Sequence, residues 1–254
     1  MELTLATICT LIVILSGGLL ILLERLFPYD RGQPLLRQGF LTDLGLYAIV
    51  QSYVLGLVIF ALIAWVDEQT GLSRLTLLRS QSLWTQMLVL FVAHDFYIYW
   101  FHRWQHASPL LWRIHEAHHS TTHVDWLSGS RSHSLEILIN QTIEYLPIVL
   151  LASPEIALMK GATDAVWGMY IHSNINVRSG RLQLLINGPE MHRWHHANDH
   201  RSHNRNFSTK LAIWDWVFGT AYLPADEKPT TYGLGDDFPK GYIGQHLHAF
   251  RRKD

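Results

Sequence analysis

Residues 83–119 read LWTQMLVLFVAHDFYIYWFHRWQHASPLLWRIHEAHH, and this stretch decides the fold because it joins a long apolar segment to two clusters of histidines. The clusters are residues 102–106 (HRWQH) and 115–119 (HEAHH), and a third, residues 192–196 (HRWHH), follows another apolar segment. Imidazole suits iron, zinc, copper or nickel, whereas magnesium and calcium prefer oxygen ligands. Eight imidazoles beside membrane-length segments therefore predict a metal centre at a membrane surface.

Apolar segments recur along the chain of 254 residues, of which 48% are hydrophobic and only 16% are charged. Residues 3–23 lack a charged side chain over a length that can cross the hydrocarbon core of a bilayer. Residues 44–66, 83–101, 135–152 and 156–175 are further long apolar stretches. The sequence predicts an all-α integral-membrane bundle of four or five membrane segments with a histidine-rich helical cap.

Basic residues are distributed unevenly around these segments. Arg25, Arg31 and Arg37 follow the first segment, and the polar tail from Arg178 onward is rich in lysine and arginine. Cytoplasmic loops of membrane proteins carry an excess of these residues, so the histidine clusters and the C-terminus are predicted to be cytoplasmic. The first segment lacks a basic start and a small-residue cleavage site, and it is predicted to be a retained anchor rather than a signal peptide.

The spacing of the histidines indicates how they share helix faces. His102 and His106 are four residues apart, a separation that places both side chains on one face of a helix. In the second cluster His115 pairs in the same way with His119, whereas His118 and His119 are adjacent and diverge by about 100° around the axis. One helix can therefore serve two metal ions. Because the third cluster repeats the HxxHH pattern, two such helices facing each other predict six ligands around a pair of ions.

Other polar residues near the clusters have more than one interpretation. His172 lies where the last apolar segment leaves the membrane, and an ionisable side chain there is a functional candidate or an interfacial polar residue. Asp95 lies nearly on the helix face of His102, so it is expected either to orient an imidazole or to make a structural hydrogen bond. The role of His94 is left open, and His133 is a candidate for a ligand, a residue that supports a ligand, or a helix-start residue. The histidines in polar surroundings are predicted to be exposed: His123, His200, His203, His246 and His248.

Residues 115–119 also fit HExxH, the zinc metalloprotease signature in which two histidines bind zinc and the glutamate is the general base. A membrane-embedded zinc metalloprotease using His115, Glu116 and His119 is therefore an alternative, although it leaves the remaining clustered histidines without a role. A carboxylate di-iron bundle needs two Glu-x-x-His motifs, and the clusters hold one. A non-enzymatic metal-binding or metal-transport protein is a third possibility. A net charge of −1 gives no reason to expect a nucleic-acid partner, and the single Cys9 excludes an iron–sulfur cluster.

A series of motifs surrounds and includes the histidine clusters: His94-Asp95-Phe96, Tyr99-Trp100-Phe101-His102-Arg103 with His106, His115 with His118-His119, Arg131-Ser132-His133-Ser134-Leu135-Glu136, His172-Ser173-Asn174, His192 with His195-His196, Asn206-Phe207, Trp214-Asp215 and Phe218-Gly219-Thr220. In these motifs the chain resembles the fatty acid hydroxylase / sterol desaturase superfamily of integral-membrane di-iron oxygenases over about residues 90–225. Ser134 and Ser208 stand where that family commonly has proline and glycine.

The resemblance implies an O2-dependent di-iron oxidoreductase that hydroxylates or desaturates a membrane lipid, with O2 as co-substrate. It divides the chain into membrane segments and loops over residues 1–82, a catalytic domain over 83–225 and a polar tail over 226–254. No nicotinamide or flavin fingerprint is visible, so a separate electron donor of the ferredoxin, cytochrome or reductase type is expected. Aromatic residues such as Trp112 and Trp167 are expected either to line the substrate path or to form an interfacial belt. The ligands implied for the two iron ions are His102, His106, His115, His118, His119, His172, His192, His195 and His196.

Overall fold

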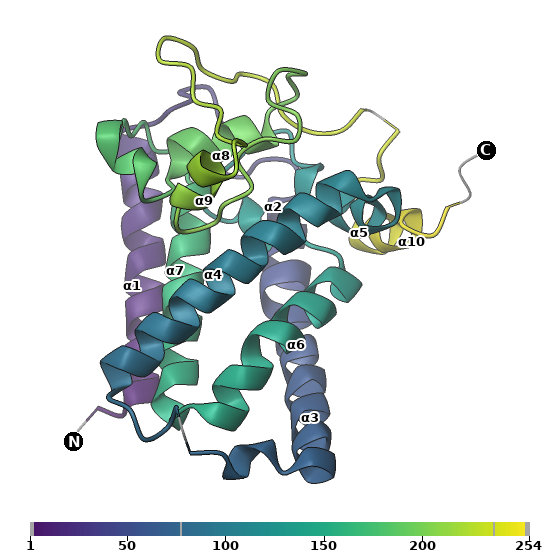
Figure 1. The fold of residues 1–254 in the computed structure, drawn as a ribbon. Helices are drawn as coiled ribbons and strands as arrows, with labels where there is room; N and C mark the ends of the chain where they lie inside the picture. Colours follow the sequence, from purple (N-terminus) through teal and green to yellow (C-terminus); the bar gives the residue numbers. More distant parts are fainter. Residues whose placement is uncertain (1–2, 77, 236, 252–254) are drawn as a thin grey trace.

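The computed structural model describes residues 3–76, 78–235 and 237–251, which form helices and loops with two isolated β-bridges and no strand. The long helices in this described part of the chain are α1 (Leu5–Leu26), α3 (Ser52–Thr70), α4 (Leu83–Ala107), α6 (Ser134–Leu151) and α7 (Pro154–His172) (Figure 1). The shorter ones are α2 (Phe40–Thr42), α5 (Pro109–His119), α8 (Pro189–His196), α9 (Ile213–Val217), α10 (Tyr242–His248), the π-helical η1 (Asp43–Gln51), and the 3-10 turns η2 (Leu72–Arg74), η3 (Ser128–Ser130) and η4 (Gly180–Leu184). The predicted all-α class is confirmed.

Among the described residues, three helical runs are long and apolar enough to cross a membrane: Leu5–Leu26, Phe40–Thr70 and Ser134–Leu151. Large apolar side chains on their surfaces face outward, as expected for lipid contact; Leu15 in α1, for example, is 69% exposed. The predicted count of four or five segments is not confirmed. The helices α4 and α7 cover the predicted segments at 83–101 and 156–175, but they carry buried polar residues along their length.

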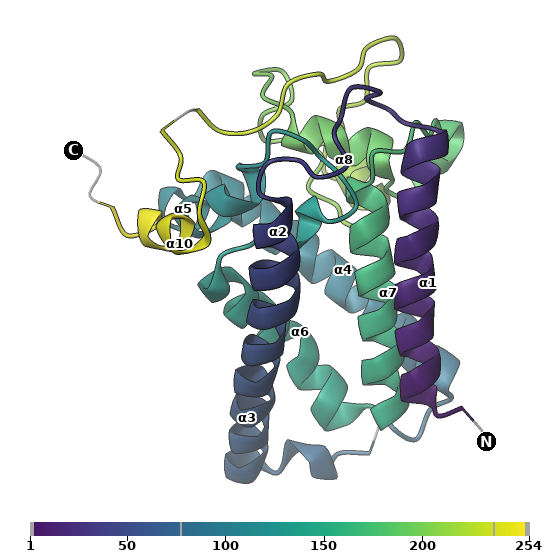
Figure 2. The same ribbon diagram turned by 180° about the vertical axis from the view of Figure 1, so that it is seen from behind.

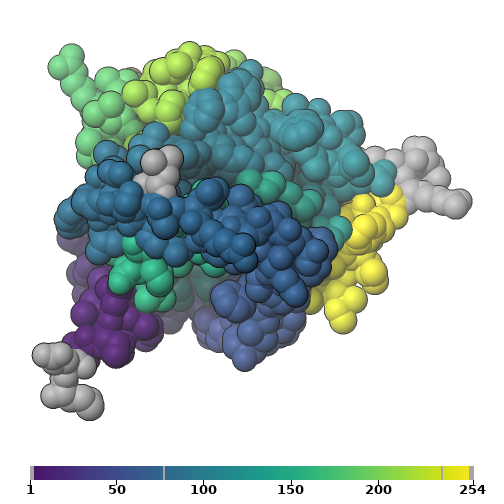
Figure 3. Space-filling view, turned by 60° about the horizontal axis from the view of Figure 1, so that its bottom comes forward, coloured from purple at the N-terminus to yellow at the C-terminus, as the bar shows by residue number. Residues whose placement is uncertain are grey.

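The long helices bring every histidine cluster to one end of the molecule. Figures 1 and 2 show α1 beside α7, and α4 crossing the bundle diagonally. The α6–α7 hairpin turns at Ser153, at the end where the N-terminus lies, so α7 returns towards the C-terminal end of α4. Figure 3 shows the end of the molecule where the N-terminus and the α6–α7 turn lie, opposite the histidine clusters. There α1 (purple) and α3 (blue) are separated by green atoms of the α6–α7 region.

A tight turn between α4 and α5 places the first two clusters opposite each other. The helix α4 begins at a Ser82 cap, whose hydroxyl accepts from the amide of Thr85, and it continues beyond the apolar segment to Ala107. Ser108 then caps α5 by accepting from the amide of Leu111, and Pro109 occupies the first helical position, where its missing N–H is not needed. The second cluster therefore folds back towards the first.

A buried network of ion pairs joins the N-terminal helices to the loop that precedes α6. The carboxylate of Asp43 lies 2.7 Å from a guanidinium nitrogen of Arg37 and 2.8 Å from Nε of Arg131. Arg37 also binds Asp125 at 2.8 Å. All of these charged groups are nearly inaccessible to solvent, so each depends on its partners for stabilisation.

We expect Asp43→Ala to lower the free energy of unfolding by about 3–5 kcal/mol, because it leaves the buried Arg131 guanidinium without its carboxylate. Thermal unfolding of the purified protein in detergent measures this change. Asp199→Ala is the matched control, since it breaks a surface pair with Arg201 and exposed pairs contribute little. Equal shifts of Tm in the two variants would contradict the prediction.

Candidate metal centre

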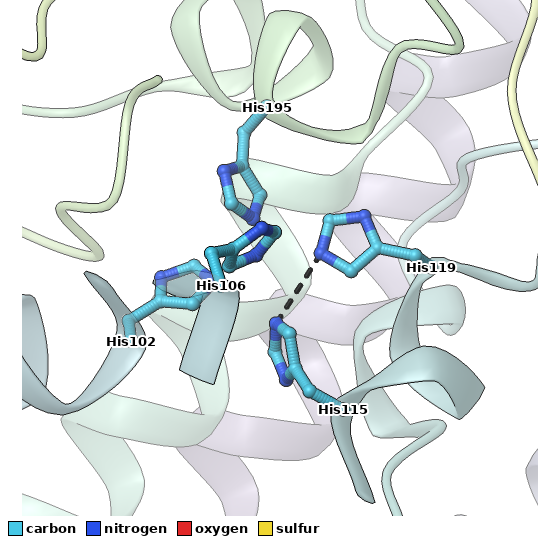
Figure 4. Close-up of side chains that lie close together, drawn as sticks. All are labelled: His102, His106, His115, His119 and His195. Carbon is cyan, nitrogen blue, oxygen red and sulfur yellow. Dashed lines mark hydrogen bonds between the residues drawn. The ribbon is translucent and has the colours of Figure 1, made fainter. Parts of the chain in front are cut away.

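Five histidines from three helices converge at the end of the bundle, and together they are called the five-histidine group. They are His102 and His106 from α4, His115 and His119 from α5, and His195 from α8. One ring nitrogen from each lies within 4.8 Å of the corresponding nitrogen of every other member. Figure 4 shows the five rings pointing towards a common centre.

Four more histidines form an adjacent cluster, the four-histidine group: His118 from α5, His172 from α7, and His192 and His196 from α8. Their Nε2 atoms face one another. The Nε2 of His172 lies 2.9 Å from that of His192, 3.2 Å from that of His196 and 3.4 Å from that of His118. Neighbouring histidines belong to different groups. In α5, His118 lies in the four-histidine group and His119 in the five-histidine group, and in α8, His196 and His195 are divided in the same way. The structure thus brings together all nine residues of the expected ligand set.

The outward nitrogens of five of these rings are held by fixed acceptors. The pairs are His102 with the carbonyl of Phe207 (2.7 Å), His195 with that of Arg205 (2.8 Å), His118 with that of Arg131 (3.0 Å), His172 with that of Gly168 (2.8 Å), and His115 with the carboxylate of Glu136 (2.8 Å). In each pair Nδ1 must donate, so a neutral ring has a bare lone pair on Nε2. Ligating histidines in metalloproteins are commonly oriented by contacts of this kind.

Imidazole nitrogens whose lone pairs face one another need a cation between them. His118 and His172 both donate through Nδ1, so their Nε2 atoms, 3.4 Å apart, are two acceptors that cannot bond to each other. Two imidazole nitrogens that each lie about 2.1 Å from one metal ion, at angles near 90–110°, would be about 3.0–3.4 Å apart. Burial lowers the pKa of His119 and of His196 well below the usual range, which favours the neutral form that binds metal. The residues present therefore fit a pair of metal ions.

The loop at residues 205–208 supports the five-histidine group through the carbonyls of Arg205 and Phe207, and carboxylates hold this segment in place. Asp215 accepts from the backbone amides of Phe207 (2.8 Å) and Ser208 (2.9 Å). Asp95 accepts from the amides of Lys210 and Leu211. Asp95 thus makes structural hydrogen bonds, and the interpretation that it orients an imidazole is wrong for the contacts present.

Three further histidines make contacts that place them outside both histidine groups. His133 caps α6 by accepting the amide hydrogen of Leu135 at 3.1 Å, so it is a helix-start residue outside both groups. His94 hydrogen-bonds to the side chain of Lys160 and not to a histidine of either group. The prediction of exposure is correct for His200 and His203 and wrong for His123, His246 and His248, which are half-buried. His246 binds the hydroxyl of Ser134 at 2.8 Å.

Two residues that shape the site are not recognisable as site residues from the amino-acid sequence. Glu136 is buried and binds His115, and the only signal for it was its place in the Arg131–Glu136 stretch. Gly129, in η3, lies against His172 so closely that a Cβ atom there would come within 2.5 Å of the ring Nδ1. No motif marks this glycine, because the contact joins distant parts of the chain.

Two cavities reach the histidines from different sides. A cavity of about 530 Å³ is bordered by His106, His119, His195 and Trp112 together with the loops at residues 197–204 and 233–235. A second cavity, of about 210 Å³, lies among α4, α6 and α7 and borders both groups. The site is therefore bordered by one cavity at these loops and by another within the bundle.

We expect Glu136→Gln to lower metal affinity by roughly 10–100-fold, since it removes the negative charge that polarises His115 while keeping the shape of the side chain. Metal content after dialysis against a graded chelator series measures the effect. Glu155→Gln provides the control, because that glutamate is exposed in the first turn of α7. The prediction fails if both variants retain metal like the unchanged protein.

Comparison with known proteins places the site within a described family. A model of the fatty acid hydroxylase family matches residues 87–220. The chain is 32% identical to the ornithine lipid hydroxylase OlsE of Rhizobium tropici over 169 residues, which is 66% of this chain and 51% of that protein. It is 32% identical to the alkylglycerol monooxygenase of Homo sapiens over 57% of this chain and 32% of that protein. It is 30% identical to methylsterol monooxygenase 1-3 of Arabidopsis thaliana over 53% of this chain and 47% of that protein. The chain thus spans about half or less of the length of these relatives, and no solved structure matches it significantly.

Proposed function

Because the chain belongs to the fatty acid hydroxylase family, we propose that it is a di-iron oxygenase that hydroxylates or desaturates a membrane lipid. Its relatives are named as hydroxylases and monooxygenases, which supports an oxygenase that acts on lipids. The observation that carries the proposal is the convergence of nine buried imidazoles into two adjacent groups. A catalytic unit over residues 83–225 would contain all of them.

The five-histidine group would hold one ion and the four-histidine group the other. Two ferrous ions bound there would supply the chemistry that splits O2 and attacks an unactivated C–H bond. Hydroxylation balances as R–H, O2, two electrons and two protons giving R–OH and water. Desaturation removes two hydrogens instead and yields two waters. The chain's own contribution is to keep the imidazoles neutral, fix their direction through backbone carbonyls and Glu136, and exclude bulk water by burial.

The electrons would come from a separate donor of the ferredoxin, cytochrome or reductase type. The 530 Å³ cavity opens among the polar loops of the cap and reaches His106, His119 and His195, so it offers a short route from a docked donor. We infer that this end faces the cytoplasm. Arg31 and Arg37 lie in the loop between α1 and α2, on the same side as the histidines, in agreement with the excess of basic residues in cytoplasmic loops.

The contacts of Glu116 disfavour the zinc metalloprotease alternative. A general base must reach the metal-bound water, but Glu116 binds the guanidinium of Arg251 at 2.9 Å and lies 3.7 Å from His248. His115 and His119 also share their group with three further histidines, which a single HExxH zinc site would not need.

Metal analysis of the purified protein, combined with lipid profiling of cells with and without the gene, tests the proposed function. We expect two irons per chain, turnover that depends on O2 and a reductant, and a lipid mass change of one oxygen or two hydrogens. Glu116→Gln should retain this activity, and His195→Ala should lose it. One zinc per chain with the opposite behaviour of the two variants would support the protease instead. Movement of metal across vesicles without O2 consumption would indicate a transporter.

A further inference from the structure

The 210 Å³ cavity is the place where a substrate would meet both groups. The imidazoles of the two groups that border it are those of His102, His115, His118, His172 and His192. Pockets that enclose a whole drug-sized ligand measure about 300–1,000 Å³. This cavity can therefore enclose only part of a lipid, and the character of its walls indicates which part.

The wall opposite the histidines is charged. His94, Glu144 and Asp164 have ligand atoms within 4.8 Å of one another, an arrangement that could suggest a third metal site. The ammonium of Lys160 already occupies its centre, 2.9 Å from Nδ1 of His94 and 2.6 Å from Glu144, and it also donates to Asp164. Lys210 lies 2.9 Å from the other oxygen of Asp164. Two ammonium groups thus face two carboxylates, and the further charged residue of the lining, Glu136, is acidic, so the cavity offers no unpaired cation.

Eight side chains that border this cavity contain a buried polar atom without a hydrogen-bond partner among the described residues. Two of them, His102 and His192, belong to the histidine groups, and the oxygen of Asp164 lies 2.9 Å from the ammonium of Lys210. The other five are His94 at Nε2, Gln105 at Nε2, Glu136 at Oε2, Asn140 at Oδ1 and Trp167 at Nε1. Because an ammonium can only donate, Nδ1 of His94 accepts from Lys160, and its Nε2 carries the proton. The cavity therefore presents three unused donors, on His94, Gln105 and Trp167, and two unused acceptors, on Glu136 and Asn140. Buried polar atoms are nearly always paired in proteins, so these five require a partner from outside the chain.

We propose that this cavity binds the oxygen-bearing head region of the lipid substrate and that this region carries no phosphate or carboxylate. Hydroxyl, ether, ester or amide oxygens satisfy the donors of His94 and Trp167. A phosphate or free carboxylate finds no unpaired cation in the wall, and an apolar tail leaves all five polar atoms unpaired. With the head beside the histidines, the oxidised C–H bond lies within a few bonds of the head. This inference rests on the proposed function. In the hydroxylation, one oxygen atom of O2 enters that C–H bond and the other leaves as water, while the electron donor supplies two electrons, taken up with two protons.

The test uses cells that carry the gene, a deletion strain, and that strain complemented with variants. The probe is the membrane lipid of these cells, and tandem mass spectrometry locates the added oxygen or double bond. We expect it within the first few carbons from a head that carries no phosphate or carboxylate. Modification near the middle or the methyl end of an acyl chain would overturn the inference while leaving the proposed function intact. If wild-type and deletion cells had the same lipids, the proposed function would fail, and the inference with it.

Trp167→Phe removes only the indole donor and keeps an aromatic ring. We expect it to lower product yield about 3–10-fold, the effect of one lost hydrogen bond, and to scatter the position of the modification along the chain. Asn140→Leu removes the acceptor with little change of shape and should act in the same direction. The matched control is Trp84→Phe, since Trp84 is 79% exposed at the start of α4. Iron content and thermal unfolding of each purified variant show that the metal groups and the fold are intact. Unchanged yield and position in both cavity variants would overturn the proposal and indicate a cavity that holds only water.

Discussion

His196→Ala is expected to reduce bound iron from two ions per chain to one and to lower turnover by on the order of 10³-fold or more, beyond the 10–100-fold typical of residues behind the ligands. The Nε2 of His196 lies 3.1 Å from that of His192 and 3.2 Å from that of His172, so its removal takes away one of four converging lone pairs. The proposed reaction needs two electrons and both iron ions, so a chain with one ion should not complete it. The remaining iron should be the one in the five-histidine group, whose members the substitution leaves in place.

The matched control is His200→Ala, four residues further along the same polar segment. Its side chain is 90% exposed, and it belongs to neither group. Iron content and O2-dependent product formation should match those of the unchanged protein. Iron quantification, followed by single-turnover assays with a chemical reductant, separates loss of metal from loss of a donor-docking surface. Two irons and full turnover in His196→Ala would contradict the assignment of the four-histidine group as a metal site.

Local geometry explains why so much of the site is predictable from sequence. The i, i+4 spacing of His102 and His106, and the divergence of His118 from His119, depend only on the pitch of a helix. The chain forms those helices where the apolar segment and Pro109 predict them. The division into five and four histidines is not predictable in the same way, because it depends on how α5 and α8 face each other across the tertiary structure.

The groups that hold the imidazoles in place depend on distant contacts. The carbonyl that orients His102 belongs to Phe207, 105 residues later, and sequence spacing contains no information about such a contact. The number of membrane segments also depends on such distant contacts, which sequence spacing does not show. Hydropathy counts Lys160 and Asp164 against a membrane segment in α7, but it does not show that both are paired with residues of α6 and of the loop before α9.

Gly129→Ala is expected to displace His172 and to deplete iron from the four-histidine group, although residue 129 is not itself a ligand. A Cβ at this position would lie 2.5 Å from Nδ1 of His172, 2.7 Å from Cε1 and 2.9 Å from Cγ, closer than such atoms approach in proteins. The ring has little freedom to move away, because Nδ1 is bound to the carbonyl of Gly168 at 2.8 Å and the ring centroid lies 4.3 Å from that of the His192 ring. Either the ring turns and its Nε2 leaves the group, or the η3 backbone shifts.

Both movements predict a loss of activity of roughly 10–100-fold, as for other groups that position a metal ligand. Gly56→Ala separates this effect from a general cost of replacing glycine, because a Cβ at Gly56 in α3 meets nothing within 4 Å. That control should retain two irons and unfold at an equal or higher temperature, since alanine favours a helix interior over glycine. Measuring iron content, turnover and Tm on the same preparations distinguishes a displaced ligand from a destabilised fold. If Gly129→Ala bound two irons and turned over normally, His172 could not be a ligand held in the position described, and the four-histidine group would have to bind its ion through the remaining three.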